Sequence, residues 1–226
     1  MGEFFFNLIN MKPEVFSGLM GQMAQGCWQT AEIFFYTALF SVPLGVVVAL
    51  LRESALKPVG AVTRFYQLVM RGTPLMLQLM FVMYGPYYMF GVSMNRFFAC
   101  ILAFVINYAA YFGEIFRAGI NAIPQGQYEA GKVLGYTRVQ TFMYIVLPQV
   151  IKQVLPPAGS EFLVLVKDTA LANVIAQPQL FDVAKKTSGS MVSIVPLVVA
   201  AVIYLVMSAV VEACFHQAER RLDYYW

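Results

Sequence analysis

Long apolar stretches without a charged residue alternate with short polar segments along this chain. Residues 33–51, 72–95 and 97–113 contain no Asp, Glu, Lys or Arg. A helix needs about 20 mostly apolar residues to cross the hydrocarbon core of a bilayer, and these stretches are of that order. The pattern therefore predicts an all-α, polytopic membrane protein.

Five transmembrane helices account for the apolar stretches, within one transmembrane domain that comprises residues 1–226. The predicted spans cover approximately residues 28–51, 66–86, 97–117, 142–166 and 191–214. The ends of the fourth span are the hardest to define, because it carries Lys152 and Glu161 and is interrupted by Pro156-Pro157. Residues 1–26 contain no basic segment ahead of a short apolar core, so we expect no cleavable signal peptide.

The prolines of the fourth span predict a break in that helix. Pro156-Pro157-Ala158-Gly159 comes just before Glu161. Discontinuous helices are common at transport sites, because unwound backbone exposes carbonyl and amide groups to a solute. The alternative interpretation is a re-entrant turn without solute contact.

Composition agrees with a membrane protein and excludes several other classes. Of the 226 residues, 60% are hydrophobic and 12% are charged, whereas about a quarter of a typical soluble domain is charged. The net charge is only +3 and the basic residues are scattered, unlike the basic stripe of a nucleic-acid-binding protein. Cys27, Cys100 and Cys214 lie far apart in apolar surroundings, and His216 is the single histidine. We therefore expect neither a disulfide framework nor a metal site.

The distribution of basic residues predicts the orientation in the membrane. Lys and Arg are enriched in the cytoplasmic flanks of membrane helices. With the N-terminus outside, ten of the 15 basic residues fall on the inner side, and the C-terminus is cytoplasmic. These ten are Arg52, Lys57, Arg64, Arg71, Arg117, Lys132, Arg138, Lys152, Arg220 and Arg221. The others are Lys12, Arg96, Lys167, Lys185 and Lys186. Tyr87, Tyr88 and Tyr224–Trp226 then fall where interfacial aromatic residues are expected.

The segment 118–141, between the third and fourth spans, is polar. Glu129, Lys132 and Arg138 place it in water, and a water-facing segment of this length in a small membrane protein is usually a docking surface. The other interpretation is an ordered cytoplasmic loop without a partner.

A short helix from about Gln127 to Leu134 is expected within this polar segment, lying along the inner membrane surface. Pro124 and Gly126 can end the preceding helix and turn the chain. Gly135 gives the backbone the freedom to reverse. Such a protruding helix would act as a rigid lever.

Polar side chains inside the predicted spans are the candidates for a substrate pathway. An ionisable residue at membrane depth costs about 2.5–3.5 kcal/mol on insertion scales, so we expect it to face a cavity or a partner. Asn107, Tyr111 and Glu114 share one face of the third span. Glu114 also fits a position at the cytoplasmic interface beside Arg117, and we favour that interpretation for it.

Glu161, Lys167 and Asp168 form a second set of pathway candidates. Glu161 and Asp168 share a face if the helix continues, and a cavity lined by them would contact the charged groups of a polar solute. Alternatively, Lys167 and Asp168 pair with each other or with another helix only to offset burial. Thr73 and Gln78 are weaker candidates, since polar side chains often simply bond packed helices together.

A motif runs from the polar segment into the fourth span. It reads Glu129-Ala130-Gly131, then Gly135, then Ile145-x-Leu147-Pro148. It resembles the cytoplasmic coupling motif of ABC importer permeases, with the spacing from glutamate to proline intact. The resemblance implies that Glu129, Ala130, Gly131, Gly135, Leu147 and Pro148 couple the chain to an ATPase. Gly131 replaces the family's more usual alanine, and we expect it to loosen the helix locally, because Gly costs ~1 kcal/mol of helix propensity relative to Ala.

Four further motifs are similar to one branch of that family, the polar amino-acid permeases. They are Arg71–Leu75 with Gln78, Glu114–Ile120, Ile123–Gln127 and Lys167–Leu171. With the coupling motif they cover roughly residues 30–215. The resemblance implies a type I importer fold, with a coupling helix between spans 3 and 4, in the bacterial inner membrane.

The resemblance also implies a set of partners. These are a second permease subunit, identical or related, two ATP-binding cassette ATPase subunits that use ATP and Mg, and an extracytoplasmic solute-binding protein that delivers a polar amino acid. The chain has no Gly-x-x-x-x-Gly-Lys-Ser/Thr pattern for phosphate binding. We therefore expect that it is not an enzyme and that it binds no cofactor itself.

Two other classes of protein compete with this interpretation. An ion-coupled secondary amino-acid carrier would be supported by internal inverted repeats, and the sequence shows no convincing repeat. A membrane-embedded enzyme would need Glu114, Asp168 and His216 as its acid-base groups, and these lie on different segments.

Overall fold

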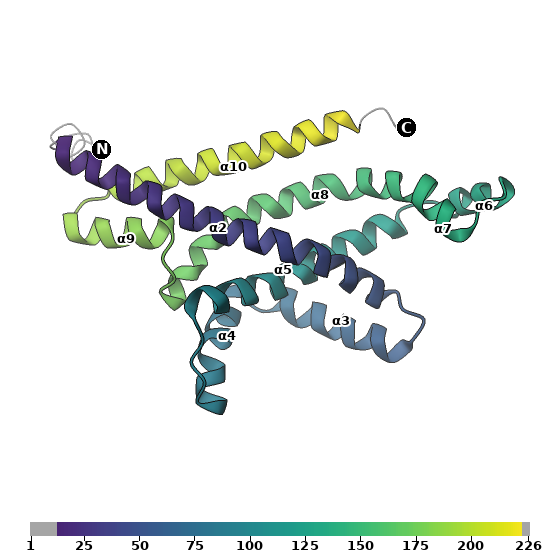
Figure 1. Ribbon diagram of the computed structural model, residues 1–226, viewed down its shortest axis with the longest axis horizontal. Coiled ribbons are helices and arrows are strands. Elements are labelled where there is room, and N and C mark those ends of the chain that lie inside the picture. The colour runs from purple at the N-terminus through teal and green to yellow at the C-terminus, as the bar shows by residue number, and fades with distance from the viewer. Residues whose placement is uncertain (1–12, 223–226) are drawn as a thin grey trace. The chain divides into compact units, whose positions relative to one another are not determined.

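The computed structural model describes residues 13–222, and in this part of the chain it contains helices and no strands (Figure 1). The α-helices are α2 (Pro13–Arg52), α3 (Lys57–Gly72), α4 (Leu75–Phe90), α5 (Arg96–Asn121), α6 (Gln125–Val133), α7 (Arg138–Thr141), α8 (Leu147–Asp168), α9 (Leu180–Met191) and α10 (Val195–Arg221). A π-helix, Phe142–Val146, precedes α8, and a 3₁₀-helix, Thr169–Ile175, follows it. The all-α prediction is confirmed.

The chain forms two compact units, each assembled from three separate segments. Unit 1 comprises Met1–Ala38, Pro74–Phe104 and Val164–Val210. Unit 2 comprises Leu39–Thr73, Val105–Leu163 and Val211–Trp226. Helices α2, α5, α8 and α10 each contribute residues to both units, whereas α6 and α7 belong wholly to unit 2.

The core of unit 1 lies where α2, α9 and α10 pack together. Its buried members are Leu19 and Met23 of α2, Leu180 and Ala184 of α9, and Val195 and Ala200 of α10. The hydroxyl of Thr30 accepts a hydrogen bond from the backbone amide of Leu180 at 3.0 Å, at the first turn of α9. Helix α9 therefore begins on a polar contact with α2, and the sequence had not predicted this helix.

Unit 2 is packed through small residues and stacked aromatic rings. A Cβ atom added at Gly45 would lie 2.6 Å from Cβ of Phe112, so the backbones of α2 and α5 approach more closely than any larger residue permits. The ring of Phe162 in α8 lies 5.1 Å from that of Phe112 and 5.1 Å from that of Phe215 in α10. The aromatic column thus joins α5, α8 and α10.

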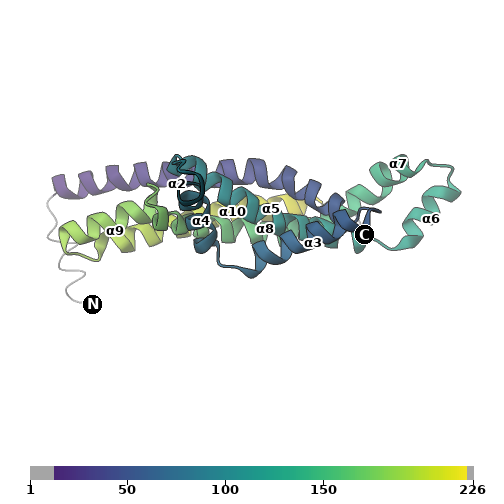
Figure 2. The ribbon, with the colours of Figure 1, turned by 90° about the horizontal axis from the view of Figure 1, so that it is seen from below.

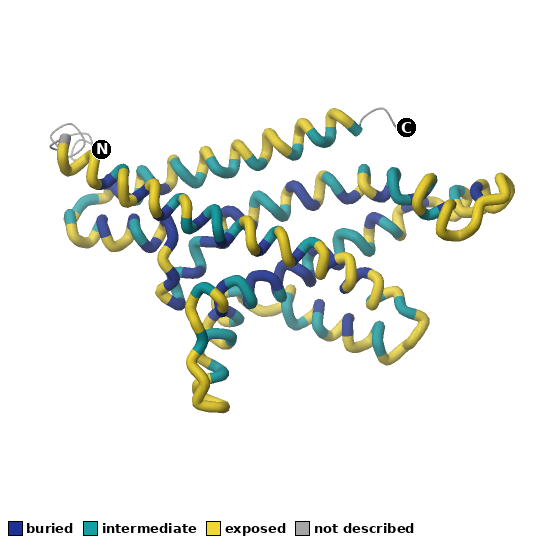
Figure 3. Tube along the Cα trace, viewed as in Figure 1, coloured by how far each residue is buried: buried dark blue, intermediate teal, exposed yellow. Residues whose placement is uncertain are grey.

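Many positions along the helices are exposed (Figure 3), and many of these carry large apolar side chains. On α2 and α10 they include Phe35, Phe40, Leu50, Leu205 and Val206, all more than half exposed. An outward apolar surface of this extent is unfavourable in water and is the expected surface of a helix that faces lipid. It supports the prediction of a membrane protein.

Three helices of the described residues are long and apolar enough to cross a membrane, namely those over Glu14–Arg52, Arg96–Asn121 and Val195–Arg221. There are up to four if α3 and α4 count as one interrupted span. The count of five also requires α8, which is long enough but carries Lys152, Glu161, Lys167 and Asp168. Five spans therefore stays a prediction, and so does the single transmembrane domain.

The predicted span 66–86 consists of two helices in the structure. Thr73 (φ −120°, ψ 148°) and Pro74 (φ −61°, ψ 130°) are both extended, and they separate α3 from α4. Proline disfavours a helical conformation of the residue before it, which explains why the interruption falls at Thr73.

The predicted break at Pro156-Pro157 is wrong. Helix α8 runs through both prolines, from Leu147 to Asp168. Proline has a φ near the helical value, and here the next residues, Ala158 and Gly159, are buried, with Gly159 close to the ring of Phe215. That packing favours the continuous helix. The α-helix ends instead after Asp168, where the 3₁₀-helix begins.

Some predictions fall on parts of the chain that the structure does not describe. Lys12, used in the orientation, and the aromatic residues Tyr224–Trp226 lie outside residues 13–222.

Candidate coupling site

Helices α6 and α7 form a helical hairpin, residues 125–141, that projects beyond the start of α8 (Figure 2). Pro124 is the N-cap of α6, with φ −59° and ψ 143°, and its carbonyl accepts a hydrogen bond from the Gln127 amide at 3.0 Å. Proline suits the start of a helix, because its missing N–H would be unpaired there in any case. The sequence predicted a helix from about Gln127 to Leu134, and the structure shows it at Gln125–Val133.

Gly135 makes the turn that ends α6. Its φ is +79°, in the left-handed region that favours glycine. The amide of Tyr136 donates to the Gly131 carbonyl at 3.0 Å, and the amide of Gly135 donates to the Lys132 carbonyl at 3.1 Å. This pair of bonds is the Schellman arrangement, which satisfies the last carbonyls of a helix. The predicted reversal at Gly135 is confirmed.

A capping box starts α7. The Thr137 hydroxyl accepts from the Gln140 amide at 3.3 Å, and the Gln140 side chain accepts from the Thr137 amide at 2.9 Å. These two bonds satisfy donors that a helix start otherwise leaves unpaired. The turn between α6 and α7 is therefore bonded on both sides.

Gly131 is where the two arms of the hairpin meet. It is buried, and a Cβ atom at this position would lie 2.5 Å from both Cγ2 and Oγ1 of Thr141. Thr141 is itself buried at the end of α7. The structure thus gives Gly131 a packing role that the sequence had not indicated, since we had expected it only to loosen the helix.

The outer surface of the hairpin combines charged and apolar side chains. Glu129 and Ala130 are exposed, as are Lys132 and Arg138. Val133, Leu134 and Val139 are exposed by 88%, 67% and 72%. Apolar side chains this exposed among charged ones are typical of a surface that contacts another protein.

Leu147 and Pro148 lie at the first turn of α8 and are half-buried. The π-helix Phe142–Val146 directly precedes them. Pro148 has no N–H to donate to a carbonyl in the preceding turn, and a local change in the helical bonding pattern is a common consequence. The hairpin is therefore joined to α8 through a segment that is not α-helical.

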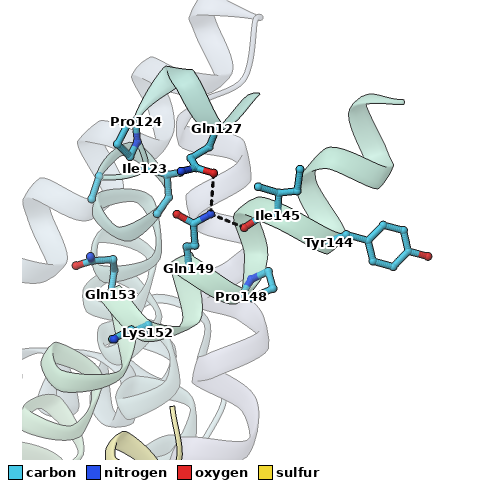
Figure 4. Close-up of a pocket in the computed structure, with 10 residues that line it drawn as sticks. Ile123, Pro124, Gln127, Tyr144, Ile145, Pro148, Gln149, Lys152 and Gln153 are labelled. Carbon is cyan, nitrogen blue, oxygen red and sulfur yellow. Dashed lines mark hydrogen bonds between the residues drawn. The ribbon is translucent and has the colours of Figure 1, made fainter. Parts of the chain in front are cut away.

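A cavity of about 530 Å³ lies beside this junction (Figure 4). Gln127, Gln149, Lys152 and Gln153 provide its polar groups, and Tyr144 and Pro148 are among its other lining residues. The Gln149 amide nitrogen donates to the carbonyl of Ile145 at 2.7 Å and to the Gln127 side chain at 3.3 Å. Gln149 therefore ties α6 to the start of α8 across the cavity.

Glu114, one of the predicted pathway residues, lies in an ion network at the end of α5. The Arg117 guanidinium donates to both carboxylate oxygens of Glu114, at 2.6 Å and 3.1 Å. It also contacts Glu53 at 3.4 Å, and Asn121 donates to that same carboxylate at 3.2 Å. The interpretation of Glu114 as a partner of Arg117 is consistent with this geometry.

Asn107 and Thr73, two other pathway candidates, bond to backbone carbonyls of α3. The Asn107 amide donates to the Met70 carbonyl at 3.0 Å, and the Thr73 hydroxyl donates to the Val69 carbonyl at 2.8 Å. Tyr111, on the same face of α5 as Asn107 and Glu114, has its ring 5.5 Å from the Arg71 guanidinium carbon. Part of the polar character of this face therefore serves to hold α3 against α5.

The remaining pathway candidates lie on α8. Glu161 is half-buried and belongs to unit 2. Lys167 is exposed and Asp168 is half-buried, and both belong to unit 1 at the end of the helix. Their part in a pathway stays a prediction. Among residues 13–222, no three His, Cys, Asp or Glu side chains are grouped so that they could hold a metal ion.

Sequence reasoning missed three partners at these sites. Thr141, which faces Gly131, and Glu53 and Asn121, which join the Arg117 network, had not been singled out. No sequence signal identifies the last two as partners of each other, because Glu53 and Asn121 are 68 positions apart.

A helical protein whose long helices carry apolar side chains on their outer surfaces fits a membrane component. Its sequence matches the family described as "Binding-protein-dependent transport system inner membrane component" over residues 41–224. Because this match covers most of the chain, the protein belongs to that family.

Individual relatives are similar over nearly the whole chain. The L-cystine transport system permease protein TcyB of Bacillus subtilis (strain 168) is 34% identical over 205 residues, which are 90% of this chain and 87% of that protein. The arginine transport system permease protein ArtQ of the same organism is 34% identical over 199 residues, 88% of this chain and 91% of that protein. Neither name describes an ion-coupled carrier.

Solved structures of ABC transporters are also similar to this chain. A crystal structure of an amino acid ABC transporter with histidines matches with a TM-score of 0.84 and 33% identity, over 94% of this chain and 99% of the other. The MetNI methionine ABC transporter in an inward-facing conformation matches with a TM-score of 0.74 at 16% identity, over the same shares of the two chains, which shows the fold alone.

Proposed function

We propose that this protein is the permease subunit of an ABC importer for polar amino acids and forms half of the translocation pathway. The proposal is carried by the α6–α7 hairpin, in which α6 presents the exposed Glu129 and Ala130 and the following turn is bonded on both sides. Membership of the binding-protein-dependent family and the names of the relatives, which include cystine and arginine permeases, support it.

The hairpin is the element that would receive motion from an ATPase subunit. Its turn is held by the Schellman bonds and the capping box, and its arms touch at Gly131 and Thr141. An element whose polar groups are satisfied internally moves as one body when a partner pushes on its exposed face. Gln149 then passes the displacement to α8, because its side chain in α8 is hydrogen-bonded to the Gln127 side chain in α6.

The proposed assembly contains three kinds of protein partner. Two ATP-binding cassette subunits dock at the hairpin from the cytoplasm and use ATP and Mg. A second permease subunit, identical or related, completes the pathway, and an extracytoplasmic solute-binding protein delivers the amino acid. In this proposal the protein is a multi-pass component of the bacterial inner membrane, with its N-terminus outside and its C-terminus in the cytoplasm, and it is not itself a catalyst.

An uptake assay in proteoliposomes tests the class. The complete transporter, with its ATPase and binding protein, would be supplied with labelled cystine, arginine or glutamine, the amino acids in the names of its relatives. We expect uptake of at least one of them that requires ATP inside the vesicle and is insensitive to collapse of ion gradients. Uptake that continues without ATP and stops when the gradients collapse would show an ion-coupled carrier instead.

A further inference from the structure

Helix α3 presents a polar face to the protein and an apolar face to the outside. On the inner face, the Tyr66 hydroxyl donates to the Ile106 carbonyl, and the buried Gln67 donates to the Ala110 carbonyl at 3.4 Å. On the outer face, Val62, Phe65 and Leu68 are exposed by 69%, 67% and 69%. In unit 2, therefore, α3 has the surface of a helix bounded by lipid on one side.

Basic residues flank this apolar face. Lys57, Arg64 and Arg71 are spaced by seven, so they lie in one row along α3, and all three are exposed. The Arg71 guanidinium lies over the Tyr111 ring. Lys57 and Arg64 instead line a groove at the beginning of α3.

That groove has a volume of about 500 Å³, and it joins the end of α2 to the start of α3. Its principal lining residues are Arg52, Lys57, Gly60, Arg64, Phe65 and Leu68. The Arg52 Nε donates to the Gln67 side chain at 3.0 Å, which fixes the guanidinium at one edge. A Cβ at Gly60 would lie 3.3 Å from the Arg52 carbonyl, so a glycine lets the two helix ends come together here.

The groove carries three basic side chains and no acidic one. Its acidic neighbour along the chain, Glu53, is bonded to Arg117 and Asn121. The first turn of α3 contains no acidic residue, and its N-cap, Leu56, offers no side-chain acceptor. The charged side chains that line the groove therefore point to an anionic ligand.

We propose that this groove binds the phosphate-bearing headgroup of an anionic phospholipid. Arg52, Lys57 and Arg64 contact the phosphate, and Phe65, Leu68 and Val62 contact the acyl chains. Basic pockets beside membrane helices hold such headgroups, and the long stems of Lys and Arg reach the headgroup level from within the apolar region. A soluble phosphate ion would use the charges but leave the apolar wall uncovered. With the orientation proposed above, the lipid belongs to the inner leaflet.

Lipid retention by the complete transporter complex tests this proposal. The detergent-purified complex would be titrated with phosphatidylglycerol against phosphatidylcholine, and bound lipids counted by native mass spectrometry. The test variant combines Lys57→Gln with Arg64→Gln. The control variant is Arg221→Gln, which neutralises an exposed arginine at the end of α10. We expect preferential retention of phosphatidylglycerol by the unaltered complex and by the control. Each neutralised side chain should weaken that retention by roughly five-fold.

Two further arms identify the ligand. Phe65→Ser should weaken binding of long-chain phosphatidylglycerol while leaving any binding of inorganic phosphate unchanged. Retention equal to that of the unaltered complex in the Lys57 and Arg64 double variant would overturn the proposal. So would displacement of the lipid by millimolar inorganic phosphate, which would indicate a site for a soluble anion. Cross-linking of an Arg64→Cys variant to a second permease or to the ATPase in native membranes would show that protein covers the groove, and would also overturn it.

Discussion

The α6–α7 hairpin and the packed helices of unit 2 satisfy their polar groups in different ways. In the hairpin the partners are close in sequence, as in the bond from the Tyr136 amide to the Gly131 carbonyl and the capping box of Thr137 and Gln140. Between the packed helices they are distant, as with Asn107 and the Met70 carbonyl, 37 positions away. The hairpin therefore holds its own shape and can move as one piece, whereas α3 and α5 hold each other.

The largest loss of stability is expected at the contact between α6 and α7, the two arms of the hairpin. Gly131→Ala would place Cβ against Thr141, and overpacking of this kind costs about 1–3 kcal/mol. Adding Thr141→Ala removes the clashing atoms and should restore most of the loss, as a double-mutant cycle on thermal unfolding would show. Gly126→Ala, in the same helix but with open space around it, is the matched control and should be neutral or slightly stabilising. An equal change in stability for Gly131→Ala and Gly126→Ala would refute the packing role of Gly131.

A second destabilising effect is expected at Gly135, in the turn between α6 and α7. Gly135→Val forces a β-branched residue into φ +79°, at a cost of roughly 1–2 kcal/mol, and it should expose the hairpin to proteolysis between α6 and α7. Gly189→Val is the control, since Gly189 has open space and no positive φ. Limited proteolysis of the assembled complex measures the difference, and resistance equal to that of the control would count against a turn that depends on glycine.

A smaller effect is expected in the ion network of the packed helices. Arg117→Gln leaves the half-buried Glu114 carboxylate without its guanidinium, and we expect a loss of about 1 kcal/mol in stability. Glu53→Gln should change stability by less than about 0.5 kcal/mol, because this carboxylate is half exposed and its contact is longer. Chemical unfolding of both variants in detergent would test which substitution costs more stability. A greater loss from Glu53→Gln would reverse the assignment of the principal pair.

A similarly small loss of stability is expected at Asn107. Asn107→Ala removes the bond to the Met70 carbonyl, and hydrogen bonds between membrane helices average about 0.6 kcal/mol. If the side chain only holds α3 against α5, the Michaelis constant for amino-acid uptake should stay the same while the unfolding midpoint falls slightly. A raised Michaelis constant with unchanged stability would instead place Asn107 in the substrate pathway.

The same contrast explains what could be predicted from the sequence. The α6 helix and the turn at Gly135 were predicted because proline and glycine act through the local backbone. The partner of Gly131 was not predicted, because a Cβ clash with Thr141 depends on how two helices fold together. The helix break assigned to Pro156-Pro157 was wrong for a related reason: local propensity was outweighed by the packing of Ala158 and Gly159.

The sequence identified the charged residues in the spans but not all of their partners. The sequence placed Glu114 beside Arg117, three positions away, yet Glu53 and Asn121 joined them only through the tertiary fold. Helix α9 was missed because its short amphipathic segment is covered by α2 and α10, contacts that have no local signature.

ATPase activity of the reconstituted transporter tests the coupling role of the hairpin most directly. Glu129→Lys reverses a charge on the exposed face of α6, and Glu212→Lys makes the same change at an exposed position of α10. We predict that Glu129→Lys lowers the stimulation of ATP hydrolysis by binding protein and amino acid by at least about ten-fold, the equivalent of 1.4 kcal/mol, with membrane insertion intact and Glu212→Lys unaffected. Full stimulation in the Glu129→Lys transporter would contradict a coupling role for the hairpin.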